Sequence, residues 1–252
     1  GWYGYGGPKV APDRPLGYDP PLCWIPRYLD NSSGGEVWVP RDRWGALAGQ
    51  LLHLSYGRCQ TMLVLRDIVE GQPQGAIVPM KGRFLSGIMR GRFRPQDGHL
   101  YLTGLKGWVT SALRDGCLQR VRYTGEKLSM PVAFHAHRNG LRLTFSEPLD
   151  RALANDADNY GLEQWTYLYA AEYGSKEYSA RRPGVEGHDA VELRRATLLE
   201  DGRTVFLEIP DLKPVMQFQV QYNLADKEGA TVGGRLIATL NRLGPVFDPT
   251  GK

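Results

Sequence analysis

The sequence has few of the patterns that mark metal, haem or membrane proteins. Its three cysteines, Cys23, Cys59 and Cys117, form neither a C-x-x-C nor a C-x-x-C-H pattern, so nothing supports a zinc site or covalent haem. The pairing of these cysteines stays open between one disulfide with a free thiol and three buried thiols. No apolar run reaches the roughly 18 residues that a transmembrane helix needs, so we expect no membrane span.

The sequence also lacks blocks of like charge and known catalytic motifs. The net charge is +4, and the basic residues are scattered along the sequence without a block, so we expect no nucleic-acid partner. There is no G-x-S-x-G motif, no Ser-His-Asp order and no phosphate loop, and no catalytic residue is predicted. We do not expect the chain to be catalytic on its own.

What the sequence does contain is turn-rich strand patterning. It has 31 glycines, 17 prolines and 13 tyrosines, and it alternates short apolar or aromatic runs with turn signals. This combination is typical of sheets rather than helices and predicts an all-β fold. Within residues 46–125 a unit of strand, tight turn and strand recurs, and Asp97-Gly98 is a strong hairpin signal. Such a repeat is typical of the blades of a β-propeller.

From Pro131 onward the strands become longer and alternate more cleanly. About seven strands are expected in some 110 residues, the number typical of an immunoglobulin-like (Ig-like) β-sandwich. The pair Asn139-Gly140 predicts a type I′ turn between the first two of them, and Asp201-Gly202 predicts a later turn. We therefore divide the chain into residues 1–127, the last blades of an incomplete propeller, and residues 128–252, an Ig-like β-sandwich with a C-terminal tail.

Several motifs in residues 82–125 resemble the closing part of glucose/sorbosone dehydrogenase-like propellers. In that family a Pro-Asp-Gly-type turn precedes a strand with Leu-Tyr and a final strand of the form R-V-x-Y. A longer signature looks like a subgroup within large exported multidomain bacterial proteins, some of which carry c-type cytochrome modules; it consists of Trp24-Ile25-Pro26 and residues 30–35, 54–57 and 104–108. Residues 143–150 resemble the first strands of bacterial Ig-like modules. The matching motifs of the propeller part are Pro95-Gln96-Asp97-Gly98, Leu100-Tyr101-Leu102 and Arg120-Val121-Arg122-Tyr123.

The resemblance also implies which residues would hold a cofactor. Family members that carry pyrroloquinoline quinone hold its carboxylates with arginines placed just before the turn, and a histidine from an earlier blade acts as general base. Here Arg90 and Arg92 fall in that window in a shifted register, and the blade that would supply the base is missing. We expect no cofactor in this chain; pyrroloquinoline quinone would be expected only if the chain were the C-terminal part of a quinone-linked sugar dehydrogenase.

Three further constellations are candidate binding sites. Asp156 and Asp158 offer carboxylates at a spacing suited to calcium, although the pattern lacks the Gly and distal Glu of an EF-hand. His135-x-His137 places two imidazoles on one strand face, where a third ligand would be needed for a metal. A group of aromatic residues is a candidate stacking platform for carbohydrate: Trp2, Tyr3, Tyr5, Trp24, Trp38, Trp44 and Trp108.

These observations favour a structural and interaction role. We expect the chain to be a fragment of a large exported protein, periplasmic or extracellular, in which the rest of the polypeptide or other subunits complete the propeller. Exposed blade edges invite aggregation, and we therefore expect another polypeptide to cover them. The alternative is the C-terminal part of a quinone- or haem-linked sugar dehydrogenase.

Overall fold

A computed structural model describes residues 17–170 and 174–250. It confirms the all-β class, with three antiparallel sheets whose strand order is open rather than closed in the described residues. The only helical segments in this part are the short α1 (Arg151–Asn155) and two 3-10 turns, Gly45–Leu47 and Ala157–Asn159. The finer assignment to a propeller and an Ig-like domain stays a prediction.

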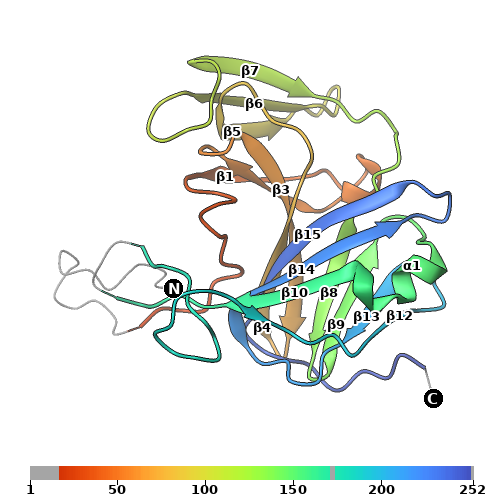
Figure 1. Cartoon of the computed structure of the whole chain (residues 1–252). Helices are drawn as coiled ribbons and strands as arrows, with labels where there is room; N and C mark the ends of the chain where they lie inside the picture. The colour runs from red at the N-terminus through yellow and green to blue at the C-terminus, as the bar shows by residue number, and fades with distance from the viewer. Residues whose placement is uncertain (1–16, 171–173, 251–252) are drawn as a thin grey trace.

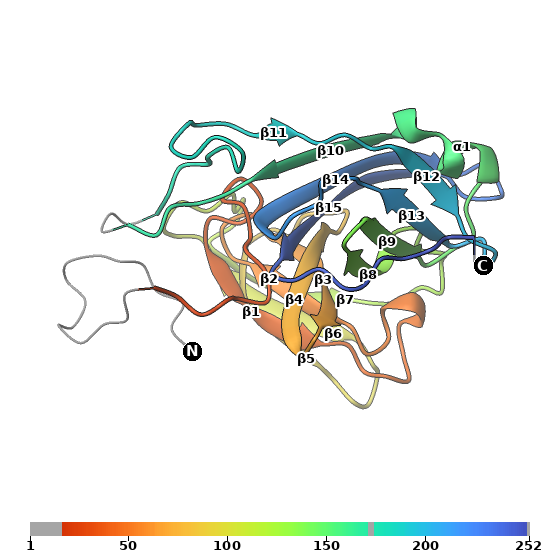
Figure 2. The same ribbon diagram turned by 90° about the horizontal axis from the view of Figure 1, so that it is seen from below.

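The largest sheet has eight strands in the order β1-β2-β3-β4-β15-β14-β10-β11 (Figures 1 and 2). Strands β1 to β4 form a meander, and β4 then pairs with β15, the last strand within the described residues. The strands are β1 (Ser33–Trp38), β2 (Leu51–Ser55), β3 (Gln60–Val69), β4 (Gln72–Pro79), β10 (Tyr160–Trp165), β11 (Asp189–Ala190), β14 (Val215–Ala225) and β15 (Thr231–Leu240).

Two smaller sheets pack against the large one. A three-stranded meander, β5-β6-β7, lies near β1 and β2, at the top of Figure 1. A four-stranded sheet, β12-β13-β9-β8, faces β14 and β15 as the second layer of a sandwich. The strands are β5 (Gly87–Phe93), β6 (Leu100–Leu105), β7 (Gly116–Val121), β8 (Pro131–His137), β9 (Gly140–Phe145), β12 (Arg195–Leu198) and β13 (Thr204–Glu208).

One hydrophobic core joins all three sheets. It includes Leu54 and Leu65 from the N-terminal half, Leu102 from the three-stranded sheet, and Leu143 and Val220 from the sandwich, all with almost no exposure. The eight-stranded sheet and the core each contain residues from before and after the predicted boundary between residues 127 and 128. The division of the chain at that boundary stays a prediction.

A buried polar network also connects the N-terminal strands β3 and β4 to β8 and to the residues after β15. Asp67 of β3 lies 2.5 Å from His135 Nδ1 of β8 and accepts a hydrogen bond from Gln74 Nε2 of β4. Gln74 Oε1 in turn accepts hydrogen bonds from the backbone N–H groups of Asn241 and Arg242, directly after β15. Satisfied buried networks of this kind fix one arrangement of the elements around them.

Close backbone approach explains how the three-stranded sheet sits on β1. A Cβ atom at Gly34 would collide with the backbone carbonyl of Ile88 in β5, so only glycine allows this contact. The turn at Asn139-Gly140 connects β8 and β9 as a hairpin, but the predicted type I′ conformation is wrong. Type I′ needs positive φ at both central residues, and of Arg138, Asn139 and Gly140 only Gly140 has it, at 155°.

Candidate arginine-rich sheet face

The three-stranded sheet brings together arginines that are far apart in the sequence. Arg90 and Arg92 lie on β5 and Arg94 directly follows it, while Arg120 lies on β7 and Arg122 directly follows it. All five are exposed. Because alternate residues of a strand point to the same side, they share the face of the sheet that looks away from Leu100 and Leu102 in the core. We call this surface the arginine face.

Strand register arranges the arginine face in rows. Tyr101 of β6 is paired with Arg92 on one side and with Arg120 on the other. Strands lie about 4.8 Å apart, so this row spans about 10 Å, and successive arginines along one strand are about 7 Å apart. The next row carries Arg90, Thr103 and Leu118. The face therefore presents a grid of cations around a tyrosine ring.

Most of these cations lack an acidic partner. Within residues 17–170 and 174–250, Arg90, Arg92, Arg120 and Arg122 form no ion pair; Arg90 Nη1 donates to the carbonyls of Gly34 and Met89. Only Arg94 is paired, with Asp97 Oδ2 at 3.0 Å. A hydrogen bond from the backbone N–H of His99, together with those from Tyr101 and Arg94, lowers the pKa of Asp97 to about 2. Four exposed guanidinium groups without a carboxylate partner therefore give this face an excess of positive charge.

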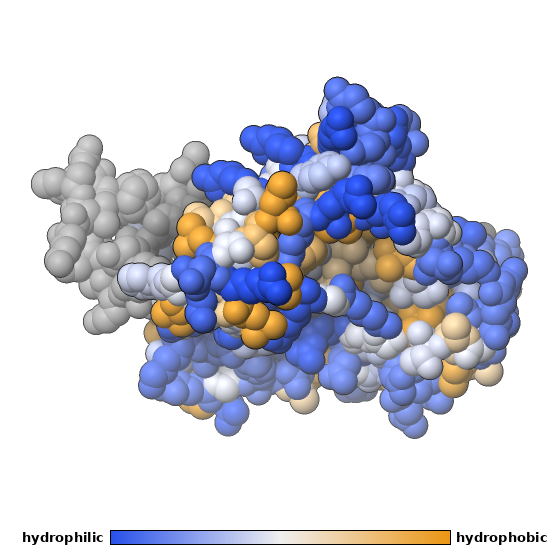
Figure 3. Space-filling model, turned by 90° about the horizontal axis from the view of Figure 1, so that it is seen from above, coloured by the Kyte–Doolittle hydropathy of each residue, from blue (hydrophilic) through white to orange (hydrophobic). Residues whose placement is uncertain are grey.

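The arginine face does not correspond to any contiguous block of basic residues in the sequence. The basic residues are scattered in sequence, yet the strand pairing of β5, β6 and β7 gathers five of them. The signal was present as alternation: Arg90, Arg92 and Arg94 follow one another at every second position, and so do Arg120 and Arg122. Exposed apolar side chains lie beside the face, and Figure 3 shows hydrophilic and apolar side chains mixed on this side of the molecule.

The other predicted sites are not brought together into a larger centre. Asp156 caps the 3-10 turn Ala157–Asn159 through a hydrogen bond from the N–H of Asp158, and both aspartates are exposed. In the described part of the chain, no three His, Cys, Asp or Glu side chains form a group that could hold a metal ion. His135 and His137 do meet, with ring centroids 4.5 Å apart, but His135 binds Asp67 and His137 lies 2.9 Å from the carbonyl of Pro245.

The aromatic residues also have separate partners. Trp24 packs on Tyr18 and Tyr167, Trp38 lies under the guanidinium of Arg66, and Trp44 contacts Phe93 and Tyr123. Trp108 is 78% exposed, and Trp2, Tyr3 and Tyr5 fall outside the described residues. The three cysteines are free thiols.

A buried ionic cluster supports the start of the large sheet. His53 of β2, with a side chain only 2% exposed, lies between two carboxylates: Asp30 Oδ2 at 2.6 Å and Glu36 Oε1 at 2.8 Å. Asp30 also accepts hydrogen bonds from Ser55 Oγ and from the backbone N–H of Ser32. Burial alone would lower the pKa of His53, but the hydrogen bonds to Asp30 and Glu36 outweigh it and raise the pKa to about 9. His53 is therefore an imidazolium at neutral pH.

We expect this cluster to make stability fall as the pH rises from about 6.5 to about 9. The pKa of His53 is higher in the folded than in the unfolded chain, so its contribution is complete below about 6.5 and is lost as the pH passes 9. The loss should be on the order of 3 kcal/mol of unfolding free energy. Urea unfolding at several pH values measures it. The variant His53→Gln serves as control, because it should remove most of this slope; an equal slope in that variant would contradict the assignment.

The described residues contain no helix that is both long and apolar enough to cross a membrane. Comparison of the chain with protein-family models, curated proteins and solved structures found no match in any of the three.

Proposed function

We propose that the chain is the interaction part of a larger exported protein and that its three-stranded sheet receives an acidic strand from a partner polypeptide. The observation that carries this proposal is the arginine face, which adjoins a strand edge that is unpaired in the described residues. The meanders β1–β4 and β5–β7 run in sequential order, as strands do inside propeller blades, while β4 continues into β15 within one eight-stranded sheet.

The open edge belongs to β7. Among the described strands it pairs only with β6, so alternate N–H and C=O groups along its outer side point away from the sheet. Leu118 of β7 is 72% exposed, and Trp108 and Leu113 in the preceding loop are exposed as well. Exposed apolar groups beside unpaired backbone mark an interaction site, because an added strand satisfies both.

The register of β7 specifies the chemistry of the partner strand. Directly opposed residues on neighbouring strands interact, and opposite charges there are favourable by about 0.2–1 kcal/mol per pair. A strand added beside Leu118, Arg120 and Arg122 would therefore carry an apolar residue and two acidic residues at alternate positions. Its acidic side chains would also lie within the positive field of Arg92 and Arg94.

The second candidate function, predicted from the sequence, is the C-terminal part of a quinone- or haem-linked sugar dehydrogenase. It assigns pyrroloquinoline quinone to Arg90 and Arg92, and these residues lie on the exposed face of the outer sheet. A quinone site at a propeller centre would need blades supplied by polypeptide beyond these residues.

A labelled peptide containing Glu-Val-Glu-Val-Leu tests the proposal by fluorescence anisotropy. We expect binding that weakens about tenfold when both Glu are replaced by Gln, a loss equivalent to roughly two cross-strand charge pairs. The double variant Arg120→Glu with Arg122→Glu should show a similar or greater loss. The matched control is Arg195→Glu, at an exposed position on β12 in the other layer, which should bind normally.

Two results would overturn the assignment. Equal affinity for the Glu and Gln peptides would show that charge is not recognised. Equal binding of a scrambled peptide of the same composition, or of a single-stranded DNA oligonucleotide, would reduce the face to general polyanion attraction.

A further inference from the structure

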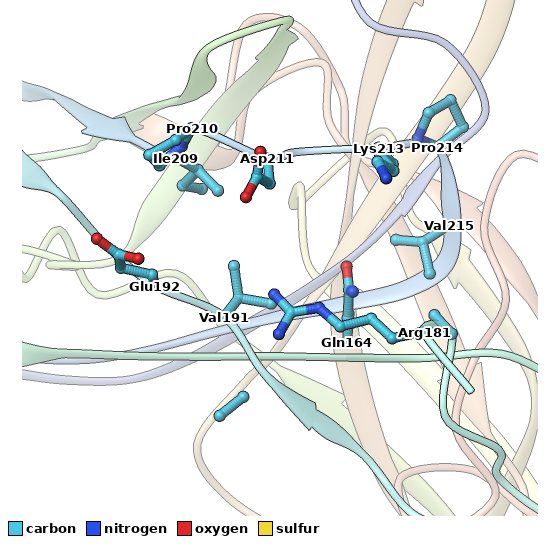
Figure 4. A pocket seen from close by; sticks show the side chains of 12 residues that line it. Gln164, Arg181, Val191, Glu192, Ile209, Pro210, Asp211, Lys213, Pro214 and Val215 are labelled. Carbon is cyan, nitrogen blue, oxygen red and sulfur yellow. The ribbon is translucent and has the colours of Figure 1, made fainter. Parts of the chain in front are cut away.

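A second surface, remote from the arginine face in the sequence and built by other strands, carries a cavity. It has a volume of about 660 Å³, within the range of small-molecule sites, and lies at one end of the sandwich. Strands β10 and β11 and the residues flanking them form one wall, and residues 209–215 between β13 and β14 form the other (Figure 4).

The inner part of the cavity contains the amide of a largely buried glutamine, which has no protein partner in the described residues. Gln164 of β10 is only 9% exposed and lies on the same side of its strand as the core residue Leu162. Its side chain makes no hydrogen bond to another described residue, and its amide atoms are not among the solvent-excluded polar atoms that lack a partner, so the amide faces the open space of the cavity. Figure 4 shows this amide directed into the cavity, between Val191, Arg181 and Val215. Such a group is a ready hydrogen-bonding site for a bound molecule.

Charges of both signs surround this amide. Arg181, Glu192, Asp211 and Lys213 line the cavity, and none of them forms an ion pair within residues 17–170 and 174–250. Figure 4 shows Glu192 and Lys213 well separated, on opposite sides of the opening. Arg181 is held in place through its backbone N–H, which donates to the buried carboxylate of Asp189 at 2.9 Å.

We propose that this cavity binds a short zwitterionic ligand of the dipeptide class. The ligand's ammonium group would lie near Glu192 and Asp211, and its carboxylate near Arg181 and Lys213. Its peptide group would pair with Gln164, whose amide offers both a donor and an acceptor. A neutral sugar would leave all four charges without a counter-charge, and no aromatic ring lines the cavity for it to stack on.

The test uses thermal shift and titration calorimetry on the whole chain with the dipeptides Ala-Ala, Ala-Leu, Leu-Ala and Ala-Glu. At least one should raise the Tm and bind measurably. N-acetylation or C-amidation of that dipeptide should each weaken binding about tenfold, because each removes one charge-assisted contact. Lys213→Gln should weaken binding to a similar extent, whereas Lys227→Gln, exposed and outside the cavity, should not.

Gln164→Leu separates this proposal from a purely structural role of the amide. It removes the donor and acceptor that face the cavity and keeps a side chain of similar size, so the Tm without ligand should change little while dipeptide binding is lost. If no dipeptide shifts the Tm of the folded chain, or if the blocked dipeptides bind as well as the free ones, the proposal is wrong. The variants Arg120→Glu and Arg122→Glu should bind the dipeptide normally, so this result is independent of the strand-docking proposal.

Discussion

Replacing Asp30 with asparagine is expected to lower the free energy of unfolding by about 3 kcal/mol at pH 7, because it leaves a buried imidazolium with only one carboxylate. The Asp30 carboxylate accepts hydrogen bonds from His53 Nε2, from Ser55 Oγ and from the backbone N–H of Ser32. These bonds connect the segment before β1 to β2. Urea denaturation monitored by circular dichroism measures the loss.

Two further variants provide comparisons for the effect of Asp30→Asn on the free energy of unfolding. Glu36→Gln should cost less, about 1 kcal/mol, since the Glu36 side chain is 52% exposed and water replaces part of its interaction. Asp42→Asn, at an exposed site, should change stability by no more than about 0.5 kcal/mol. A small loss for Asp30→Asn, comparable with that of Asp42→Asn, would show that the cluster does not stabilise the fold.

Residues 128–252 expressed alone are expected to aggregate or to unfold without cooperativity. Without β4, strand β15 loses its partner at Ile77↔Ile237 and Ala76↔Ala238, four residues with no exposure in the whole chain. The cluster around Trp165 would also lose Met62, Val64 and Ile77. Newly exposed apolar strand edges of this kind favour association between chains.

The whole chain, unfolded under the same conditions, is the control for the fragment. The predicted division into residues 1–127 and 128–252 leads to the opposite expectation, a cooperative β-sheet transition of the fragment alone. Thermal unfolding followed by circular dichroism, together with the fragment's size-exclusion profile, distinguishes the two. A monomeric fragment with a sharp transition would show that the β4–β15 pairing is dispensable.

Local turn chemistry made much of the fold predictable. Asp97-Gly98 does lie in the loop between β5 and β6, with Gly98 at φ 68°, and Asp201-Gly202 lies between β12 and β13, with Gly202 at φ 66°. Alternating apolar residues indicated strands such as β14, whose Phe218, Val220, Tyr222 and Leu224 face the core. These signals act between neighbours in sequence, so a single sequence contains them.

Pairing between distant strands was not predictable in the same way. Nothing local to residues 72–79 indicates β15 as their neighbour, because many apolar strands would satisfy β4 equally well. The arginine face depends on the β5-β6-β7 register, and the unpaired state of Gln164 depends on what surrounds it in space. The candidate sites therefore emerged from the structure, and the sequence pointed to one of them only through the alternating arginines of residues 90–94 and 120–122.

The β4–β15 pairing also has a consequence for how the chain is made. Asn241 donates its N–H to Gln74, a residue 167 positions earlier, so the first meander cannot complete its sheet until nearly the whole described chain has left the ribosome. Pairings of such long range are slow, and the unpaired edge of β4 stays open during synthesis. We expect newly made chains to depend on chaperones that protect strands β1 to β4 until β15 arrives.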